Sequence, residues 1–154
     1  MVSKSPKADT MNTTKIDHIK GFIASDHGGV QLKDCLKNKF PLIDLGPFSE
    51  DAVDYPDYAK KVCRMVVKEK SLGILICRSG IGMSMAANKC KGIRAALCRS
   101  VHDAETSRQH NHANVLVLGA DVTSAKEALK IAEKFFATPY DMDPRHVRRV
   151  KKIE

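Results

Sequence analysis

Short apolar runs alternate along this chain with segments whose apolar residues have helical spacing, and this alternation limits the folds available to it. The runs expected to form strands are residues 19–24, 41–46, 73–77, 93–98 and 114–120. The segments expected to form helices are residues 30–40, 57–70 and 124–136. Strands that alternate with helices of roughly ten to fifteen residues indicate βαβ units, because parallel strands need a crossover connection. The sequence therefore predicts an α/β protein, with a three-layer, Rossmann-like fold built on a five-stranded parallel sheet.

The length of 154 residues predicts one domain with its own hydrophobic core. Residues 1–18 are polar and show no apolar period, so we expect a disordered N-terminal leader there and a folded domain over residues 19–154. The five cysteines are scattered without a C-x-x-C pair, which argues against a structural zinc site. The chain shows no signal peptide and no apolar run near the ~20 residues that span a bilayer. These features predict a soluble cytoplasmic protein with reduced thiols.

The net charge of +8 indicates an anionic partner, which could be a phosphorylated metabolite, a nucleic acid or an acidic surface. The densest basic patch covers residues 144–152. A nucleic acid would also use such a patch, but no zinc-finger spacing or aromatic RNA-binding signature accompanies it. The aromatic content is only 5%, with no tryptophan to stack on bases. Nucleic acid therefore has little support as the partner.

The third predicted strand ends in a loop that could hold an anion. In parallel sheets ligands bind outside the carboxyl ends of the strands, which selects "CRSGIG" at residues 77–82. Gly80 and Gly82 would let the backbone approach a ligand, and Ser79 adds a hydroxyl, at the start of a helix whose first N–H groups lack partners. This cradle suits a phosphate or the oxyanion of an enediolate. The alternative is an ordinary turn from strand to helix.

Reactive side chains lie at the ends of two predicted strands. Cys77 ends the third strand, where a helix N-terminus would stabilise its thiolate, so it could act as a base or nucleophile. A cysteine that only fills the core is the alternative. Asp26 and His27 follow the first strand and could move protons or hold a polar ligand. Alternatively, Asp26 caps the next helix.

Four further polar residues lie elsewhere. His110 and Asn111 precede the fifth strand, so they would lie at the opposite edge of the sheet and could serve the site of a neighbouring subunit. A solvated helix end is the alternative. Arg145 and Arg149 are four residues apart and would share one helical face, where two guanidinium groups could clamp a phosphate. A solvated basic tail is the usual interpretation of such a segment.

Together these motifs resemble type B ribose-5-phosphate isomerase and the related galactose-6-phosphate isomerase subunits. The matching motifs are "SDHGG", "VDYPDYA", "GILIC-SGIGMSMAANK--GIRAALC", "SRQHNHANVLVLG" and "RHVRR", which occur in the same order over nearly all of residues 19–153. The resemblance implies a sugar-phosphate isomerase of the pentose phosphate pathway, which interconverts ribose 5-phosphate and ribulose 5-phosphate through a cis-enediolate without metal or organic cofactor.

The resemblance also assigns the catalytic loop. Cys77 would be the base that moves a proton between C1 and C2 of the sugar. A second subtype of the family uses a glutamate six residues beyond this cysteine, where this chain has Met83, so the chain resembles the cysteine subtype. Ser79 and the backbone N–H groups of Gly80 and Gly82 would form the anion hole.

Other roles follow from the same resemblance. Asp26 would assist proton movement at the sugar hydroxyls, His110 would open the furanose ring, and Asn111 would bind nearby. His27, Arg145 and Arg149 would hold the phosphate, and Tyr55 would line the substrate pocket. Family members are dimers, often paired into tetramers, with each site built from two chains, so the resemblance implies a homodimer or tetramer with shared sites.

Two residues depart from the family pattern. Arg78 stands where glycine is usual, and Asp121 stands where an arginine commonly contributes to the phosphate site. One hypothesis is that Arg78 replaces the missing positive charge. The alternatives to the five-carbon reaction are isomerisation of a six-carbon sugar phosphate, a catalytically weak relative that only binds sugar phosphate, and a nucleic-acid-binding role.

Overall fold

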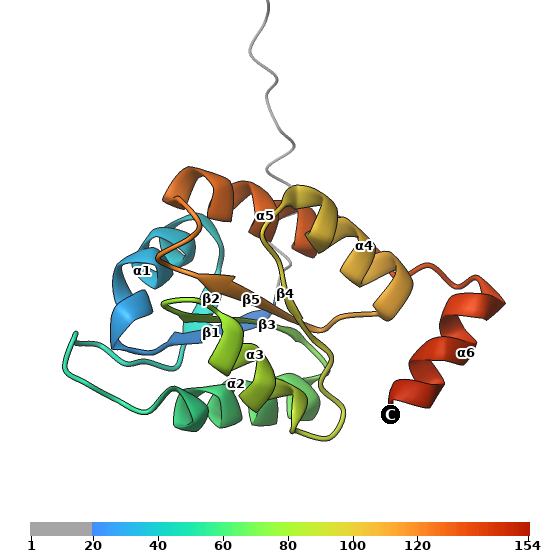
Figure 1. Cartoon of the computed structure of the whole chain (residues 1–154), viewed down its shortest axis with the longest axis horizontal. Helices are drawn as coiled ribbons and strands as arrows, with labels where there is room; N and C mark the ends of the chain where they lie inside the picture. Colours follow the sequence, from blue (N-terminus) through green and yellow to red (C-terminus); the bar gives the residue numbers. More distant parts are fainter. Residues whose placement is uncertain (1–19) are drawn as a thin grey trace, which may run out of the picture.

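Five parallel strands form a single sheet at the centre of the molecule (Figure 1). The computed structural model describes residues 20–154, so the predicted leader at residues 1–18 lies outside the described part of the chain. In the sheet the strands have the order β2-β1-β3-β5-β4. Their bounds are β1 Gly21–Ser25, β2 Leu42–Asp44, β3 Leu72–Cys77, β4 Ala95–Leu97 and β5 Val115–Gly119. The predicted five-stranded parallel sheet is confirmed.

The two central strands are buried on both faces. All five residues of β5 are buried, as are all residues of β3 after Leu72, which explains their unbroken apolar sequences. Their register pairs Cys77 with Gly119, so the two strands have their carboxyl ends next to each other. The carboxyl ends of β3 and β5 therefore lie side by side, next to the predicted catalytic loop.

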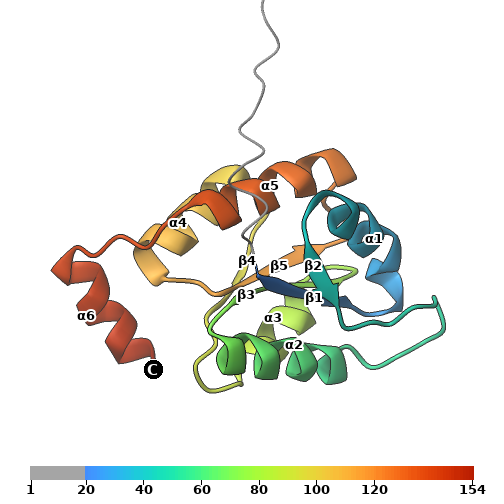
Figure 2. The ribbon, with the colours of Figure 1, turned by 180° about the vertical axis from the view of Figure 1, so that it is seen from behind.

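Helices cover both faces of the sheet, as Figures 1 and 2 show. Helices α2 and α3 pack on one face, whereas α1, α4 and α5 pack on the other. Helix α6 packs against α4 and extends beside the sheet, and Glu154, which follows α6, forms an ion pair with Arg94. The bounds are α1 Val30–Lys39, α2 Tyr55–Glu69, α3 Ile81–Asn88, α4 Val101–Asn111, α5 Ala125–Ala137 and α6 Pro144–Ile153. Among these described helices, none is both long and apolar enough to cross a bilayer.

Local signals explain where several helices begin. Ser124 accepts a hydrogen bond from the Glu127 backbone N–H at 3.2 Å, as the predicted helix start requires. A capping box of Ser100 and Asp103 starts α4, a helix whose apolar pattern is too weak to predict it. Helix α2 begins at Tyr55, two residues earlier than predicted, because a proline suits the first turn of a helix.

A lysine is buried between α1 and β2. The side chain of Lys33 is 1% exposed, and its Nζ lies 2.8 Å from Asp44 Oδ1. The same nitrogen donates to the carbonyl of Pro47, and Lys37 adds a second cation at 3.0 Å from Asp44 Oδ2. Burial alone would raise the pKa of Asp44, but hydrogen bonds from Lys33, the Gly46 amide and Lys37 outweigh it and lower that pKa.

Replacing Asp44 by asparagine should lower the free energy of unfolding by about 3 kcal/mol, because the Lys33 ammonium would stay buried without a charged partner. Urea unfolding at neutral pH measures the change. Asp34→Asn is the matched control, since the half-exposed Asp34 pairs only at the surface with Lys37 and its loss should cost less than about 1 kcal/mol.

The same pair predicts a pH dependence. Since the pKa of Asp44 is lower in the folded chain than in the unfolded one, its stabilisation is complete above the ordinary pKa of aspartate and is lost as the pH falls through the folded value. The stability difference between the natural protein and Asp44→Asn should therefore shrink in acid. An equal difference at every pH would contradict the assigned pairing.

Candidate active site

Three loops meet where β1, β3 and β5 end. Main-chain hydrogen bonds join them: the Asp26 amide donates to the Ile76 carbonyl at 3.0 Å, and the Ala120 amide donates to the Cys77 carbonyl at 2.8 Å. The Asp121 amide donates in turn to the Arg78 carbonyl at 2.9 Å. The loops are thus fixed relative to one another by the backbone, and their side chains can form a site of defined geometry.

Cys77 lies at the centre of this meeting point. Its side chain is buried, and the Gly80 N–H donates to its Sγ at 3.1 Å. Gly80 has a φ of +79°, and a Cβ at this position would lie 2.5 Å from the Leu97 side chain. Glycine is therefore required for the turn that brings an N–H onto the sulfur. The Gly80 N–H at the start of α3 is therefore aimed at the Cys77 sulfur.

The rest of the loop packs closely around its neighbours. Ser79 Oγ accepts a hydrogen bond from the Ile81 N–H at 3.2 Å. The ring of Tyr55 lies against Gly82, where an added Cβ would be 2.7 Å from the ring. The amides of Gly80 and Ile81 are thus engaged within the loop in this structure, and a bound anion would have to compete for them.

Asp26 and His27 have defined partners at the end of β1. Asp26 Oδ1 accepts the N–H groups of Gly28 at 2.9 Å and Gly29 at 3.2 Å, so this carboxylate caps the short 3-10 helix His27–Gly29. His27 Nδ1 accepts the Val53 N–H at 3.3 Å. The neutral ring then carries its proton on Nε2, which can donate to an anionic ligand.

Arg78 extends over the short turn that follows β1. An added Cβ on Gly28 would lie 2.6 Å from Arg78 Cγ, so the arginine stem covers that glycine. Its Nη1 lies 3.6 Å from Asp121 Oδ1, and both side chains are more than half exposed. The described non-glycine residues with positive φ are Lys70 and His112, so Arg78 is accommodated without backbone strain. The two departures from the family pattern therefore contact each other.

Four predicted site residues lie on the far side of the same chain. His110 and Asn111 are exposed at the end of α4, just before β5 begins. Arg145 and Arg149 are exposed on α6 (Figure 1). We refer to these four as the α4–α6 group. The strand-end group consists of Asp26, His27, Tyr55, Cys77, Ser79, Gly80 and Gly82. One chain does not bring the two groups together.

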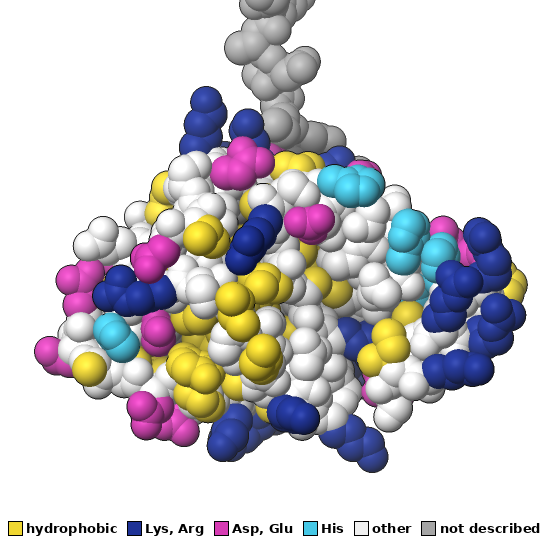
Figure 3. Space-filling view, in the orientation of Figure 1, with side chains coloured by type: hydrophobic (Ala, Val, Ile, Leu, Met, Phe, Trp, Pro, Cys, Tyr) yellow, Lys and Arg dark blue, Asp and Glu magenta, His cyan; other side chains and the backbone are white. Residues whose placement is uncertain are grey.

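The α4–α6 group has its own internal contacts. The rings of His110 and His146 stack with centroids 4.4 Å apart, which places a second imidazole beside the predicted one. Arg145 Nη2 lies 3.0 Å from Asp143 Oδ2, and this hydrogen-bonded partner lowers the pKa of Asp143 to about 2. Histidine and basic side chains gather over this end of the molecule in Figure 3. The sequence did not single out His146, because its position after Arg145 does not reveal which way the ring would turn.

A thiol, a carboxylate and an imidazole at the carboxyl ends of a parallel sheet define a class of protein that binds a small polar ligand and can move protons on it. Within residues 20–154, no three histidine, cysteine or acidic side chains gather as metal ligands would.

Comparison with known proteins identifies the family. The family model described as Ribose/Galactose Isomerase matches residues 22–153, and the chain belongs to this family. A curated relative named probable ribose-5-phosphate isomerase B, from Mycoplasma genitalium, is 47% identical over 140 residues, which cover 86% of this chain and 91% of the relative. A relative named putative sugar phosphate isomerase, from Rickettsia bellii, is 46% identical over 86% of this chain and 95% of its own.

Solved structures agree with this assignment. The ribose 5-phosphate isomerase from Thermotoga maritima has a TM-score of 0.85 and 46% identity, and the match covers 88% of this chain and 97% of that one. The ribose-5-phosphate isomerase B from Mycoplasma genitalium, solved with bound ribulose-5-phosphate, has a TM-score of 0.82 and 42% identity over 88% and 94% of the two chains.

Proposed function

We propose that this protein is an aldose–ketose isomerase that interconverts ribose 5-phosphate and ribulose 5-phosphate through an enediolate. The observation that carries the proposal is the Cys77 sulfur at the end of β3, hydrogen-bonded by Gly80 at the start of α3. Membership of the ribose/galactose isomerase family supports it, as does the relative that binds ribulose-5-phosphate. The cytoplasmic location expected from the scattered cysteines is part of the same proposal.

The strand-end group would carry the proton transfer. Cys77, as the thiolate, would remove a proton from C2 of the open-chain aldose and return it to C1 of the enediolate, which leaves the ketose. The loop of Ser79, Gly80 and Gly82 would hold the charged oxygen that develops between these steps. Asp26 would help to move protons at the sugar hydroxyls. No electron acceptor or donor is needed, because one carbon is oxidised as its neighbour is reduced.

We propose that a second copy of the chain completes each site. His110 would open the sugar ring, and Arg145 and Arg149 would bind the phosphate. These three residues lie away from the strand-end group of their own chain. Large apolar side chains are exposed beside that group: Ile81 and Met85 on α3 and Val122 after β5. Figure 3 shows apolar side chains gathered on this face. Such a patch is typical of a surface that another protein covers, so we propose a homodimer or larger assembly.

A turnover assay tests the proposed reaction. Purified protein is incubated with ribose 5-phosphate, and ketose formation is followed, with allose 6-phosphate and galactose 6-phosphate as competing substrates. We expect the highest kcat/KM with the five-carbon substrate. A preference for either six-carbon sugar would favour the rival isomerase, and binding without turnover of any sugar would favour a catalytically silent relative. A salt-sensitive RNA complex without sugar turnover would favour the nucleic-acid alternative.

The Arg78 hypothesis leads to a separate prediction. On this hypothesis the Arg78 guanidinium leaves Asp121 and binds the substrate phosphate. Arg78→Gly should then raise the KM for ribose 5-phosphate about tenfold, which corresponds to the loss of one charge-assisted hydrogen bond. It should change kcat little. Steady-state kinetics measure both constants. Lys126→Gln, which removes an exposed cation on α5, is the control for bulk charge. An unchanged KM in Arg78→Gly would show that the arginine only pairs with Asp121.

A further inference from the structure

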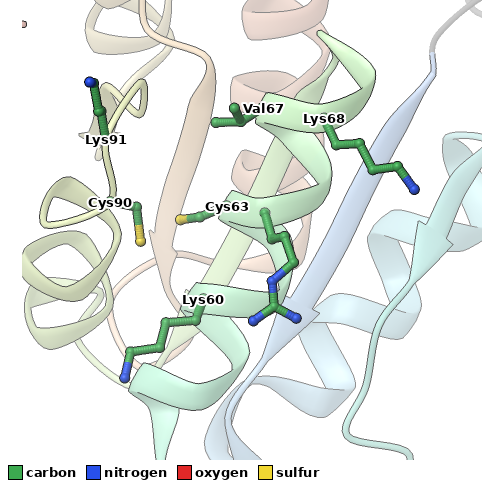
Figure 4. A pocket seen from close by; sticks show the side chains of 7 residues that line it. Lys60, Cys63, Val67, Lys68, Cys90 and Lys91 are labelled. Atoms are coloured by element: carbon green, nitrogen blue, oxygen red, sulfur yellow. The ribbon is translucent and has the colours of Figure 1, made fainter.

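Two cysteines outside the proposed active site face each other between α2 and α3. Cys63 lies in the middle of α2, and Cys90 follows the end of α3. Figure 4 shows the Cys63 side chain directed toward Cys90, with the two sulfur atoms near each other on one wall of a pocket. Cys63 Sγ lies 3.8 Å from the Ala87 carbonyl, and Cys90 Sγ lies 3.8 Å from the Ala86 carbonyl. Both sulfurs are thus anchored on neighbouring carbonyls of the same helical turn.

The two thiols differ in accessibility. The Cys63 residue is only 2% exposed, whereas Cys90 is partly exposed. Burial, and then the adjoining Cys90 thiol, raise the pKa of Cys63 well above its ordinary range. A reagent from solvent would therefore meet Cys90 first, and Cys63 would react only with a group already attached there.

The pocket around the two sulfurs has an apolar floor and a basic rim. It has a volume of about 390 Å³ and opens to solvent. Its lining residues besides the two cysteines are Lys60, Arg64, Val67, Lys68 and Lys91. Lys68 approaches Glu69 at 4.0 Å, while the other three cations form no ion pair within residues 20–154. Four cations and no acidic side chain line the pocket, so it attracts a small anion toward Cys90.

The remaining cysteines lack such a partner. Burial raises the pKa of Cys98 to about 12, and its sulfur faces the Ser107 hydroxyl at 4.0 Å. Cys77 receives the Gly80 N–H, and Cys35 lies on α1, which packs on the opposite face of the sheet from α2 and α3. Among the described residues, Cys63 and Cys90 are therefore the two cysteines whose thiols are neighbours.

We propose that Cys63 and Cys90 are a redox site that forms a reversible disulfide when a small anionic disulfide, such as oxidised glutathione, reacts in this pocket. The Cys90 thiolate attacks one sulfur of the reagent, forms a mixed disulfide and releases one glutathione thiolate. Cys63 then attacks the Cys90 sulfur and displaces the second glutathione, which takes the Cys63 proton as it leaves. Two protein thiols are oxidised to one disulfide, and one glutathione disulfide is reduced to two thiols.

The cross-link would restrain two helices that carry parts of the strand-end group. Tyr55 is the first residue of α2, and it contacts Gly82 at the start of α3. Cys63 lies farther along α2 and Cys90 lies just after the end of α3, so the disulfide would tie α2 to the segment that follows α3. The site is separate from the catalytic chemistry, so it can be tested whether or not the protein isomerises a sugar phosphate.

Thiol counting and peptide mapping test the redox site. The purified full-length protein is incubated with excess oxidised glutathione, its free thiols are blocked with N-ethylmaleimide, and its tryptic peptides are analysed by mass spectrometry. The five thiols should fall to three, with a cross-link between the peptides that contain Cys63 and Cys90. Dithiothreitol should restore all five. A stable glutathione adduct on Cys90 without the cross-link, or no reaction there, would overturn the proposal.

Matched variants separate the site from general thiol reactivity. Cys90→Ser should leave Cys63 unmodified and abolish the cross-link, while Cys35→Ser, at another partly exposed cysteine, should leave it intact. Lys60→Gln combined with Lys91→Gln should slow the reaction with oxidised glutathione severalfold but leave the reaction with neutral hydroxyethyl disulfide unchanged. Equal slowing with both reagents would show that the basic rim does not select an anionic disulfide.

Discussion

Replacing Cys77 by alanine should lower kcat for ribose 5-phosphate isomerisation by about 10³-fold. A positioned base typically accelerates proton transfer by ~10²–10⁴-fold, and alanine offers no group to replace the thiolate. The loss should fall mainly on kcat, since the neighbouring loop backbone that would bind the sugar stays in place. A ketose assay at saturating substrate measures it. Cys35→Ala, on the opposite face of the sheet, is the control and should retain full activity.

Isotope exchange sharpens this test. In D₂O, the natural protein should introduce deuterium at C1 of the product, because a proton on sulfur exchanges with solvent before it is returned. Cys77→Ala should show neither product nor exchange, as followed by NMR. If Cys77→Ala keeps activity within tenfold of the natural protein, the base is another group, and the Asp26 carboxylate at the neighbouring strand end becomes the first candidate.

Mixing two inactive variants should restore activity. On the proposed arrangement, Cys77→Ala and His110→Ala each damage every site of their own homodimer. In a heterodimer, one site combines the intact Cys77 of one chain with the intact His110 of the other, and the second site carries both substitutions. Random association of equal amounts makes half of the dimers heterodimers, so about a quarter of the natural activity should return. The assay follows ketose formation after the two proteins are unfolded together and refolded.

A second pair of variants provides the control. Cys77→Ala mixed with Asp26→Ala should stay inactive, because both residues belong to the strand-end group of one chain and no heterodimer can contain an intact site. Size-exclusion chromatography with light scattering gives the mass of each mixture. If Cys77→Ala and His110→Ala form mixed dimers without recovered activity, the two residues do not share a site.

The sequence predicted the parts of the fold that depend on local patterns. The β3 and β5 segments are apolar without interruption, as central parallel strands must be, and the structure confirms them with boundaries shifted by one residue. The loop at residues 77–82 was predicted at the correct end of the sheet because strand direction alone fixes it. Its internal hydrogen bonds, from Gly80 to Cys77 and from Ile81 to Ser79, depend on tertiary packing and were not predictable.

Helix α4 shows what local patterns miss. Its buried Arg108 donates to the carbonyls of Ala113 and Thr138 and stacks at 4.4 Å on the ring of Tyr140. Thr138 and Tyr140 lie thirty or more residues beyond Arg108, so the sequence does not mark this charged residue as part of a core, and the apolar period of the helix is weak. The contact between Arg78 and Asp121 was hidden for the same reason. The sequence presents them as two separate departures from a family pattern, and only the fold places them side by side.

Cys77 lies at the carboxyl ends of the strands and His110 lies before β5, at their amino ends, and this placement has a kinetic consequence. If each site needs residues from two chains, a free monomer cannot turn over substrate, and activity follows the square of the monomer concentration when dimers are scarce. Specific activity would then fall on dilution and recover on concentration, with no change in substrate level. The protein's own abundance would become a variable in its rate law.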